Sequence, residues 1–190
     1  MTGVMASISP EIIAKPFEMM RAIRPGLKLG VSFVNPVPGD GSRFASMQTV
    51  AGNLGLQLVQ LPEMRDMAGI DPMLAAAKKE GIQGLMLGSY SFLMSEGLRR
   101  IQAWATENNV LTSSLGLGRG EFLIVHGPSF PLLQAALYSQ IDQVLRGGNP
   151  AEIPFQAPMV FDIVISKKIA KAIGLTIPTS VLLQATEVID

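Results

Sequence analysis

The chain has 190 residues, of which 48% are hydrophobic and 16% are charged, and its 15 basic and 15 acidic residues cancel. This composition is typical of a globular protein, and the length suffices for one large domain or two small lobes. The balanced charge without a basic stripe argues against nucleic-acid binding, while the lack of cysteine and the single histidine argue against disulfides, thiolate sites and histidine-rich metal sites.

The first helical pattern contains a proline that leaves two interpretations open. A helix that starts at Ser9-Pro10 has Pro16 in its interior, where proline removes one backbone hydrogen bond and kinks the helix. The alternative is a helix that starts only at Lys15-Pro16. In both cases Arg24-Pro25-Gly26 ends the helix.

Short apolar runs and helical patterns then alternate up to residue 128. Asp71 followed by Pro72 predicts a helix start with a capping residue and a proline in the first turn. In chain order, we expect strands at 29–34, 57–61, 83–87, 110–115 and 122–125, and helices at 43–54, 71–80 and 95–108. This alternation predicts βαβ units, so the predicted fold class is α/β with a parallel sheet flanked by helices.

The last third of the chain begins with a distinct helix at 129–146. Ser129 caps it, Pro131 lies in its first turn, and Gly147-Gly148 ends it. Its apolar residues recur at helical spacing: Phe130, Leu133, Leu137, Ile141 and Val144. After a proline-punctuated linker, we expect a strand at 161–165 and helices at 167–173 and 178–187.

The C-terminal forty residues match an extended family pattern. The pattern comprises the linker Pro150–Gln156, the strand Phe161–Ser166 and the helix with its exit, Lys168–Pro178. These segments closely resemble the C-terminal signature of a family of extracytoplasmic solute-binding proteins of ABC transporters. Upstream segments that resemble the family are Thr2-Gly3, Arg24–Leu27, Val31–Pro36 and Ala51–Leu56.

The resemblance implies an organisation into one lobe and an extension. Family members have two α/β lobes with a ligand cleft between them, and this chain resembles the second lobe, with the first lobe largely missing. Residues 1–128 then form the α/β lobe, residues 129–149 the helix that returns to the missing lobe, and residues 150–190 rejoin the α/β lobe. Because an uncovered apolar stripe on helix 129–146 is costly in water, we expect it to fold back onto the lobe or to be covered by a second copy.

Ligands of open parallel sheets bind beyond the carboxyl ends of the strands, where a first loop runs from residue 35 to residue 42. It leads into a helix N-terminus, which favours an anion such as a carboxylate. The resemblance implies that this loop holds the polar end of the ligand, which makes Asn35, Gly41 and Ser42 candidate ligand-binding residues. A turn followed by a helix cap is the structural alternative.

A second loop with binding groups follows the third strand. Ser89, Tyr90 and Ser91 offer hydroxyls and an aromatic ring to a small amphipathic ligand, and a cluster of helix-capping serines is the alternative. Family members that bind amino acids often carry an aspartate here for the ligand's ammonium group. Residues 88–95 contain none, which argues against an amino acid as the ligand.

The remaining polar residues do not assemble into a catalytic pattern. The third loop, Ser113–Gly120, contains G-x-G-x-G but lies between two strands, so we interpret it as a flexible connection with a solvated Arg119. His126 ends an apolar strand without a second ligand or partner, so we interpret it as a structural histidine. With no nucleophile–base pair and no carboxylate pair, we expect neither an enzyme nor a cofactor or metal site.

These observations predict a solute-binding component of an ABC-type importer, or one lobe of it, that binds a small organic solute in an interlobe cleft. An ABC permease and a second copy of the chain are its expected partners. The alternative is an intracellular interaction or sensor module that dimerises through helix 129–146. The resemblance implies an extracytoplasmic location, whereas the lack of a signal-peptide pattern predicts a cytoplasmic one if the chain is complete.

Overall fold

A single sheet organises the protein, whose computed structural model describes residues 2–4, 10–33, 42–88, 96–116 and 118–190. Its strands are β1 (Lys28–Ser32), β2 (Gln57–Gln60), β3 (Gly84–Leu87), β4 (Leu111–Leu115), β5 (Ile124–Pro128), β6 (Phe161–Ser166) and β7 (Glu187–Ile189). They lie in the order β2-β1-β3-β4-β5-β6-β7. The first five are mutually parallel, β6 is antiparallel to β5, and β7 is parallel to β6. The predicted α/β fold class is confirmed.

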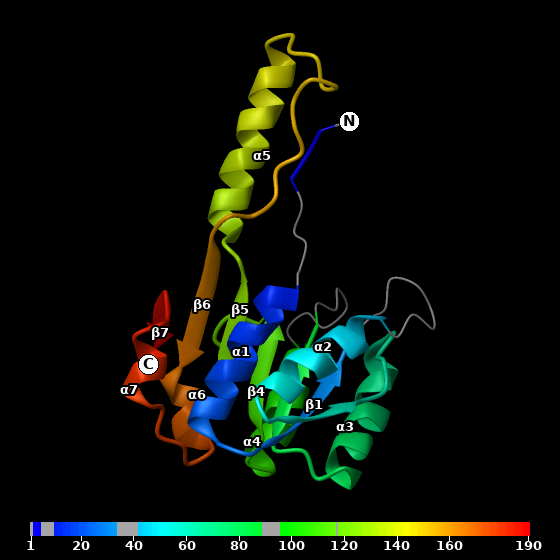
Figure 1. Ribbon diagram of the computed structural model, residues 1–190, viewed down its shortest axis with the longest axis vertical. Helices are drawn as coiled ribbons and strands as arrows, with labels where there is room; N and C mark the ends of the chain where they lie inside the picture. Colours follow the sequence, from blue (N-terminus) through cyan, green and yellow to red (C-terminus); the bar gives the residue numbers. More distant parts are fainter. Residues whose placement is uncertain (1, 5–9, 34–41, 89–95, 117) are drawn as a thin grey trace.

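Helices cover both faces of this sheet (Figure 1). They are α1 (Pro10–Ile23), α2 (Ser42–Asn53), α3 (Ile70–Lys79), α4 (Glu96–Glu107), α5 (Phe130–Leu145), α6 (Lys167–Ala172) and α7 (Thr179–Leu182), with a short 3-10 helix η1 (Met67–Gly69) before α3. Residues of α1, α2, α6 and α7 build one apolar cluster with the sheet, and residues of α3 and α4 build a second. In Figure 1, α5 instead projects away from the sheet.

The central strands are buried on both faces. Every residue of β3, β4 and β5 is buried. Because successive side chains of a strand point to opposite faces, Met86 joins the first cluster while its neighbours Leu85 and Leu87 join the second. Strands covered on both sides are typical of parallel sheets.

Helix α1 starts at Pro10 and contains Pro16 in its interior, so the interpretation that it begins at Lys15 is wrong. The hydrogen bond that Pro16 removes is outweighed by burial, since Phe17, Met19 and Met20 are at most 1% exposed.

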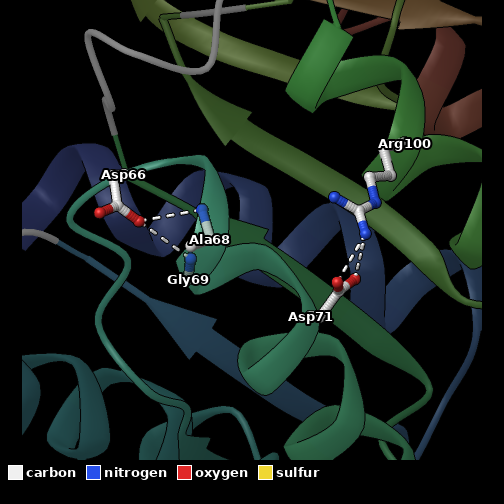
Figure 2. Close-up of polar contacts among 5 residues, drawn as sticks. All are labelled: Asp66, Ala68, Gly69, Asp71 and Arg100. Atoms are coloured by element: carbon white, nitrogen blue, oxygen red, sulfur yellow. Dashed lines mark hydrogen bonds and ion pairs between the residues drawn. The ribbon is translucent and has the colours of Figure 1, made fainter.

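Helix α3 begins with a turn that the sequence pattern did not predict. Asp66, not Asp71, is the capping residue: its carboxylate accepts hydrogen bonds from the backbone N–H groups of Ala68 (2.9 Å) and Gly69 (3.2 Å) at η1 (Figure 2). Asp71 lies in the first turn of α3, and both of its carboxylate oxygens accept from Nη2 of Arg100 on α4 at 2.6 Å. The two aspartates therefore order this segment by different contacts.

The C-terminal segment differs from the predicted helix at 178–187. Helix α7 is only one turn long, and residues 187–189 form β7 beside β6. Thr186 directs this change, because its hydroxyl donates to the carbonyl of Ile163 (3.0 Å) and accepts from the N–H of the same residue (2.9 Å). Pairing with β6 satisfies backbone groups that the end of a helix would leave open.

We predict that Asp66→Ala lowers the free energy of unfolding by about 1 kcal/mol, because two backbone N–H groups lose their acceptor. Asp71→Ala removes only an exposed ion pair and is expected to cost about 0.5 kcal/mol or less. Chemical denaturation of both variants measures the difference. A larger loss for Asp71→Ala than for Asp66→Ala contradicts the assignment of the cap.

We predict that Gly127→Ala lowers the free energy of unfolding by about 1–3 kcal/mol. A Cβ atom at Gly127 lies 2.8 Å from Cα of Gly116, so two backbone segments have to separate. The control is Gly52→Ala, where no atom lies within 4 Å of the new Cβ and the gain in helix propensity stabilises α2 by a few tenths to about 1 kcal/mol. Opposite signs in thermal unfolding support this packing, and equal effects contradict it.

Candidate functional site

The strand order creates a topological switch point between β1 and β3. From β1 the chain passes to β2 on one side, and β3 then lies on the other side of β1. The connections that leave the carboxyl ends of β1 and β3 therefore diverge, and ligands of open α/β sheets bind in the crevice that this leaves. Ser32, Leu87 and Ser114 lie in register across β1, β3 and β4 at this edge of the sheet.

The ends of β1 and β3 are joined by close packing. The N–H of Gly88 donates to the carbonyl of Ser32 at 3.0 Å, and the Ser32 hydroxyl donates to the carbonyl of Pro62 at 2.8 Å. A Cβ atom at Gly88 lies only 2.5 Å from Cδ1 of Phe33, so this position accepts no side chain without displacing the ring. The two loops that follow these strands thus start close to each other.

The predicted ligand-binding residues follow this edge in the chain. Asn35, Gly41, Ser89, Tyr90 and Ser91 lie outside the described residues. Ser42 is the first residue of α2, and its side chain also lies outside the described part. Their roles stay predictions. The close contact of Phe33 with Gly88, which supports both loops, has no signal in the sequence spacing.

The glycine-rich third loop connects β4 to β5. Gly116, Gly118 and Gly120 have φ angles of 81°, 74° and 82°, which disfavour side chains. Arg119 is solvent-exposed, as expected, and it forms an ion pair with Glu187 of β7. The sequence did not predict this pair because β7 itself was expected to be helical.

His126 is a buried structural residue, as the sequence suggested. Its side chain is 5% exposed, and Nδ1 lies 3.0 Å from the carbonyl oxygen of Ile12 in α1. Since a carbonyl only accepts, Nδ1 carries the proton. The ring also packs, tilted, on Phe161 at a centroid distance of 6.0 Å. His126 therefore joins α1 to the strands β5 and β6.

Burial lowers the pKa of His126 below its ordinary value of 6.5. The hydrogen bond to the Ile12 carbonyl opposes this lowering, and the positive charge of Lys15 adds to it. The neutral ring is thus the form that the folded protein favours.

The expectation that α5 folds back onto the lobe is wrong. Among the large apolar side chains of α5, Phe130, Leu132, Leu137, Tyr138, Ile141 and Leu145 are 37–80% exposed. Within the described part of the chain, the returning segment 150–160 lies along the helix (Figure 1), and the Gln140 side chain donates to the carbonyl of Pro154 at 3.2 Å. Gln140 is 2% exposed and its Oε1 has no partner among the described residues. The periodicity of apolar residues does not indicate that a glutamine at this position is buried.

A groove of about 570 Å³ lies between α5 and this returning segment. Its lining is mainly apolar: Ser129, Leu132, Leu133, Ala136, Gln156, Ala157, Pro158, Met159 and Val160. Met159 is 93% exposed at its rim. The groove lies away from the carboxyl ends of β1 and β3, since α5 and the segment 150–160 rise away from the sheet (Figure 1).

The described residues contain neither a metal-binding cluster nor a membrane-spanning helix. In that part of the chain, no three or more His, Asp or Glu side chains gather in a way that could hold a metal ion. The described helices also include none with the length and apolar character that crossing a bilayer requires.

Comparison with known proteins gives matches at the level of structure. No family model and no curated protein matches the sequence. A conserved domain protein from Vibrio cholerae superposes with a TM-score of 0.79 and 20% identity over 98% of this chain. An ABC domain from Streptococcus pneumoniae in complex with L-Trp gives 0.77 and 22% over 93%. A ligand-free, open substrate-binding protein with adhesive properties from Clostridium difficile gives 0.68 and 17% over 100%.

The chain spans 62% of the length of each of these three structures. Nearly all of this chain thus has a structural counterpart in them, while more than a third of each of them has none here. The fold of this protein is that of one lobe of a periplasmic-binding-protein-like α/β protein, together with its projecting helix.

We predict that the stability contributed at His126 falls with acidification. Because the pKa is lower in the folded than in the unfolded chain, protons favour the unfolded state as the pH falls below about 6.5, and the loss levels off below the folded-state pKa. His126→Asn keeps an N–H donor for Ile12 but does not titrate. The unchanged protein and His126→Asn are compared by denaturation curves. We expect the difference between their free energies of unfolding to become smaller as the pH falls from about 7.5 to about 5. A difference that is constant with pH contradicts the prediction.

Proposed function

We propose that this chain is the solute-holding lobe of an extracytoplasmic solute-binding protein that serves an ABC-type importer. A small organic solute binds in the crevice beyond the carboxyl ends of β1 and β3, and a facing lobe closes over it. The observation that carries this proposal is the switch point between β1 and β3, the strands that the two predicted ligand-binding loops follow.

The two loops offer complementary chemistry to such a solute. The N-terminus of α2, preceded by Asn35 and Gly41 and begun by Ser42, favours the anionic end of the solute. Tyr90, between Ser89 and Ser91, supplies an aromatic face and hydroxyls for its less polar part. A small amphipathic organic anion fits both requirements.

Other features agree with a binding role. The residues of the central strands are buried, so we expect the groups that bind the solute to come mainly from the loops at the strand ends. The matched structures from S. pneumoniae and C. difficile are described as an ABC domain with bound L-Trp and as a substrate-binding protein. On this basis the chain binds and releases its solute without chemical change, outside the cytoplasm, and delivers it to a permease.

The solute class can be identified by a thermal-shift screen followed by calorimetry. The panel contains aliphatic and aromatic carboxylates, the corresponding amides, and L-amino acids including tryptophan. We expect carboxylates to bind and the corresponding amides not to bind, because the partial positive charge at the helix N-terminus stabilises an anion. With one lobe, half of a cleft is present, so we expect dissociation constants on the order of 0.1–1 mM. Binding of the amides with equal affinity contradicts the anion site.

We predict that Asn35→Ala weakens binding of the identified solute by about tenfold or more, the effect of one lost hydrogen bond to a charged group. Asn53→Ala is the matched control, because Asn53 is exposed at the far end of α2. Calorimetric titration of both variants measures the effect. Equal affinities for the two variants place the solute elsewhere.

A further inference from the structure

A second groove, of about 400 Å³, lies between α6, the turn that follows it and α7. We refer to it as the α6–α7 groove. Its volume lies in the range of small-molecule sites. It combines an apolar floor with basic side chains at the rim, and the residues that matter here are Lys167, Ala170, Lys171, Leu175, Ile177 and Leu182.

The α6–α7 groove lies far from the place where a second lobe would face this one. The segment 150–160 enters β6 at Phe161, whereas α6 follows Ser166 at the other end of the same strand. Because β6 is antiparallel to β5, its last residue lies beside the start of β5 and not beside the carboxyl ends of the parallel strands. Figure 1 shows α6 and α7 away from the end of the sheet at which α5 projects. A lobe that closes over the crevice at β1 and β3 therefore leaves this groove open.

The floor of the groove is fixed by the fold of the lobe. Ala170 and Ile177 are 3% and 8% exposed and belong to the first apolar cluster, and the half-buried Leu175 and Leu182 pack against that cluster. The N–H of Leu175 donates to the carbonyl of Ala170 at 2.9 Å, across a turn in which Gly174 has a φ angle of 66°. This left-handed helix end turns the chain back over α6 and shapes an apolar surface without a ligand.

The rim of the groove is positively charged. Lys167 and Lys171 are one helical turn apart, which places them on the same side of α6. Lys171 has no hydrogen-bond or ion-pair partner among the described residues. Lys167 pairs with Asp190 at 3.1 Å, but both side chains are exposed, so this pair is weak and can be exchanged for another anion. Residues 163–186 contain three lysines and no acidic residue.

Floor and rim together select one class of small molecule. Two like charges one turn apart repel each other, and a carboxylate between them relieves that repulsion. The apolar floor favours a hydrocarbon chain over a polar body, because burial of apolar area is the main gain available there. An ammonium group, in contrast, is repelled by both lysines.

We propose that the α6–α7 groove is a second binding site, which holds a medium-chain aliphatic carboxylate. The carboxylate group lies between Lys167 and Lys171, and the hydrocarbon chain lies on the apolar floor. The site shares no residue with the crevice at β1 and β3, so it is independent of the proposed solute site.

Titration of the full chain with octanoate, followed by calorimetry and by two-dimensional amide NMR spectra, tests the site. We expect a dissociation constant on the order of 1 mM and the largest amide shifts at residues 171–177 and at Leu182. Octanamide and octylamine carry the same chain without a negative charge and are expected to bind at least about threefold more weakly. Shifts that spare these residues, or equal binding of octanamide, overturn the proposal.

Lysine variants provide a matched control on the same helix. The double variant Lys167→Gln/Lys171→Gln is expected to weaken octanoate binding about tenfold, because two ion pairs are lost. Lys168→Gln is expected to change it less than about twofold, because Lys168 is also exposed but lines a different hollow, next to Arg99. Equal effects of the double variant and Lys168→Gln overturn the proposal.

The variant Asn35→Ala separates this site from the crevice. It is expected to leave the octanoate shifts at residues 171–177 unchanged, whatever it does to the solute of the crevice. Loss of these shifts in Asn35→Ala contradicts an independent second site, whereas failure of the crevice measurements alone leaves the octanoate result as it stands.

Discussion

The packing of helices on both faces of the sheet is the constraint on which the other features of this protein depend. β3, β4 and β5 are buried throughout, and their large apolar side chains join the two apolar clusters. Glycines mark places where this packing is tightest: a Cβ atom at Gly30 lies 2.7 Å from Leu61, and one at Gly84 lies 2.8 Å from Met20. Polar groups for a ligand consequently have to come from the loops at the strand ends.

Helix α5 is the exception to this arrangement. The chain leaves the sheet at the end of β5, where Gly127 packs against Gly116, runs outward along α5 and returns along the segment 150–160 to β6. His126 and Phe161 lie in contact at the base of this excursion and join it to α1 through Ile12. The lobe is thus anchored firmly where the helix departs, while the apolar side of the helix has no partner in the lobe.

Most of the fold could be predicted from the sequence. The predictions that were wrong share one cause, which is contact between segments that are distant along the chain. β3 is an apolar run that is buried throughout, so local pattern and final burial agree there. Glu187–Ile189 is short and half exposed, and it becomes a strand because β6 offers an edge to pair with. Asp66 was missed as a cap because it precedes a 3-10 turn rather than the helix that Asp71-Pro72 suggests. At the crevice, loop residues could be proposed from chemistry, but the contact between Phe33 and Gly88 depends on neighbouring strands and has no local signal.

The amino-acid sequence by itself determined the α/β class, the positions of most strands and helices, and the polar residues of the two loops, because hydrophobic periodicity and turn residues act over a few neighbouring positions. The tertiary structure decided the strand order, the switch point between β1 and β3, the burial of Gln140 and the exposure of α5. These properties arise from contacts between segments that are distant along the chain. The free energies of these contacts depend on which surfaces meet, and the pattern of neighbouring residues does not determine that.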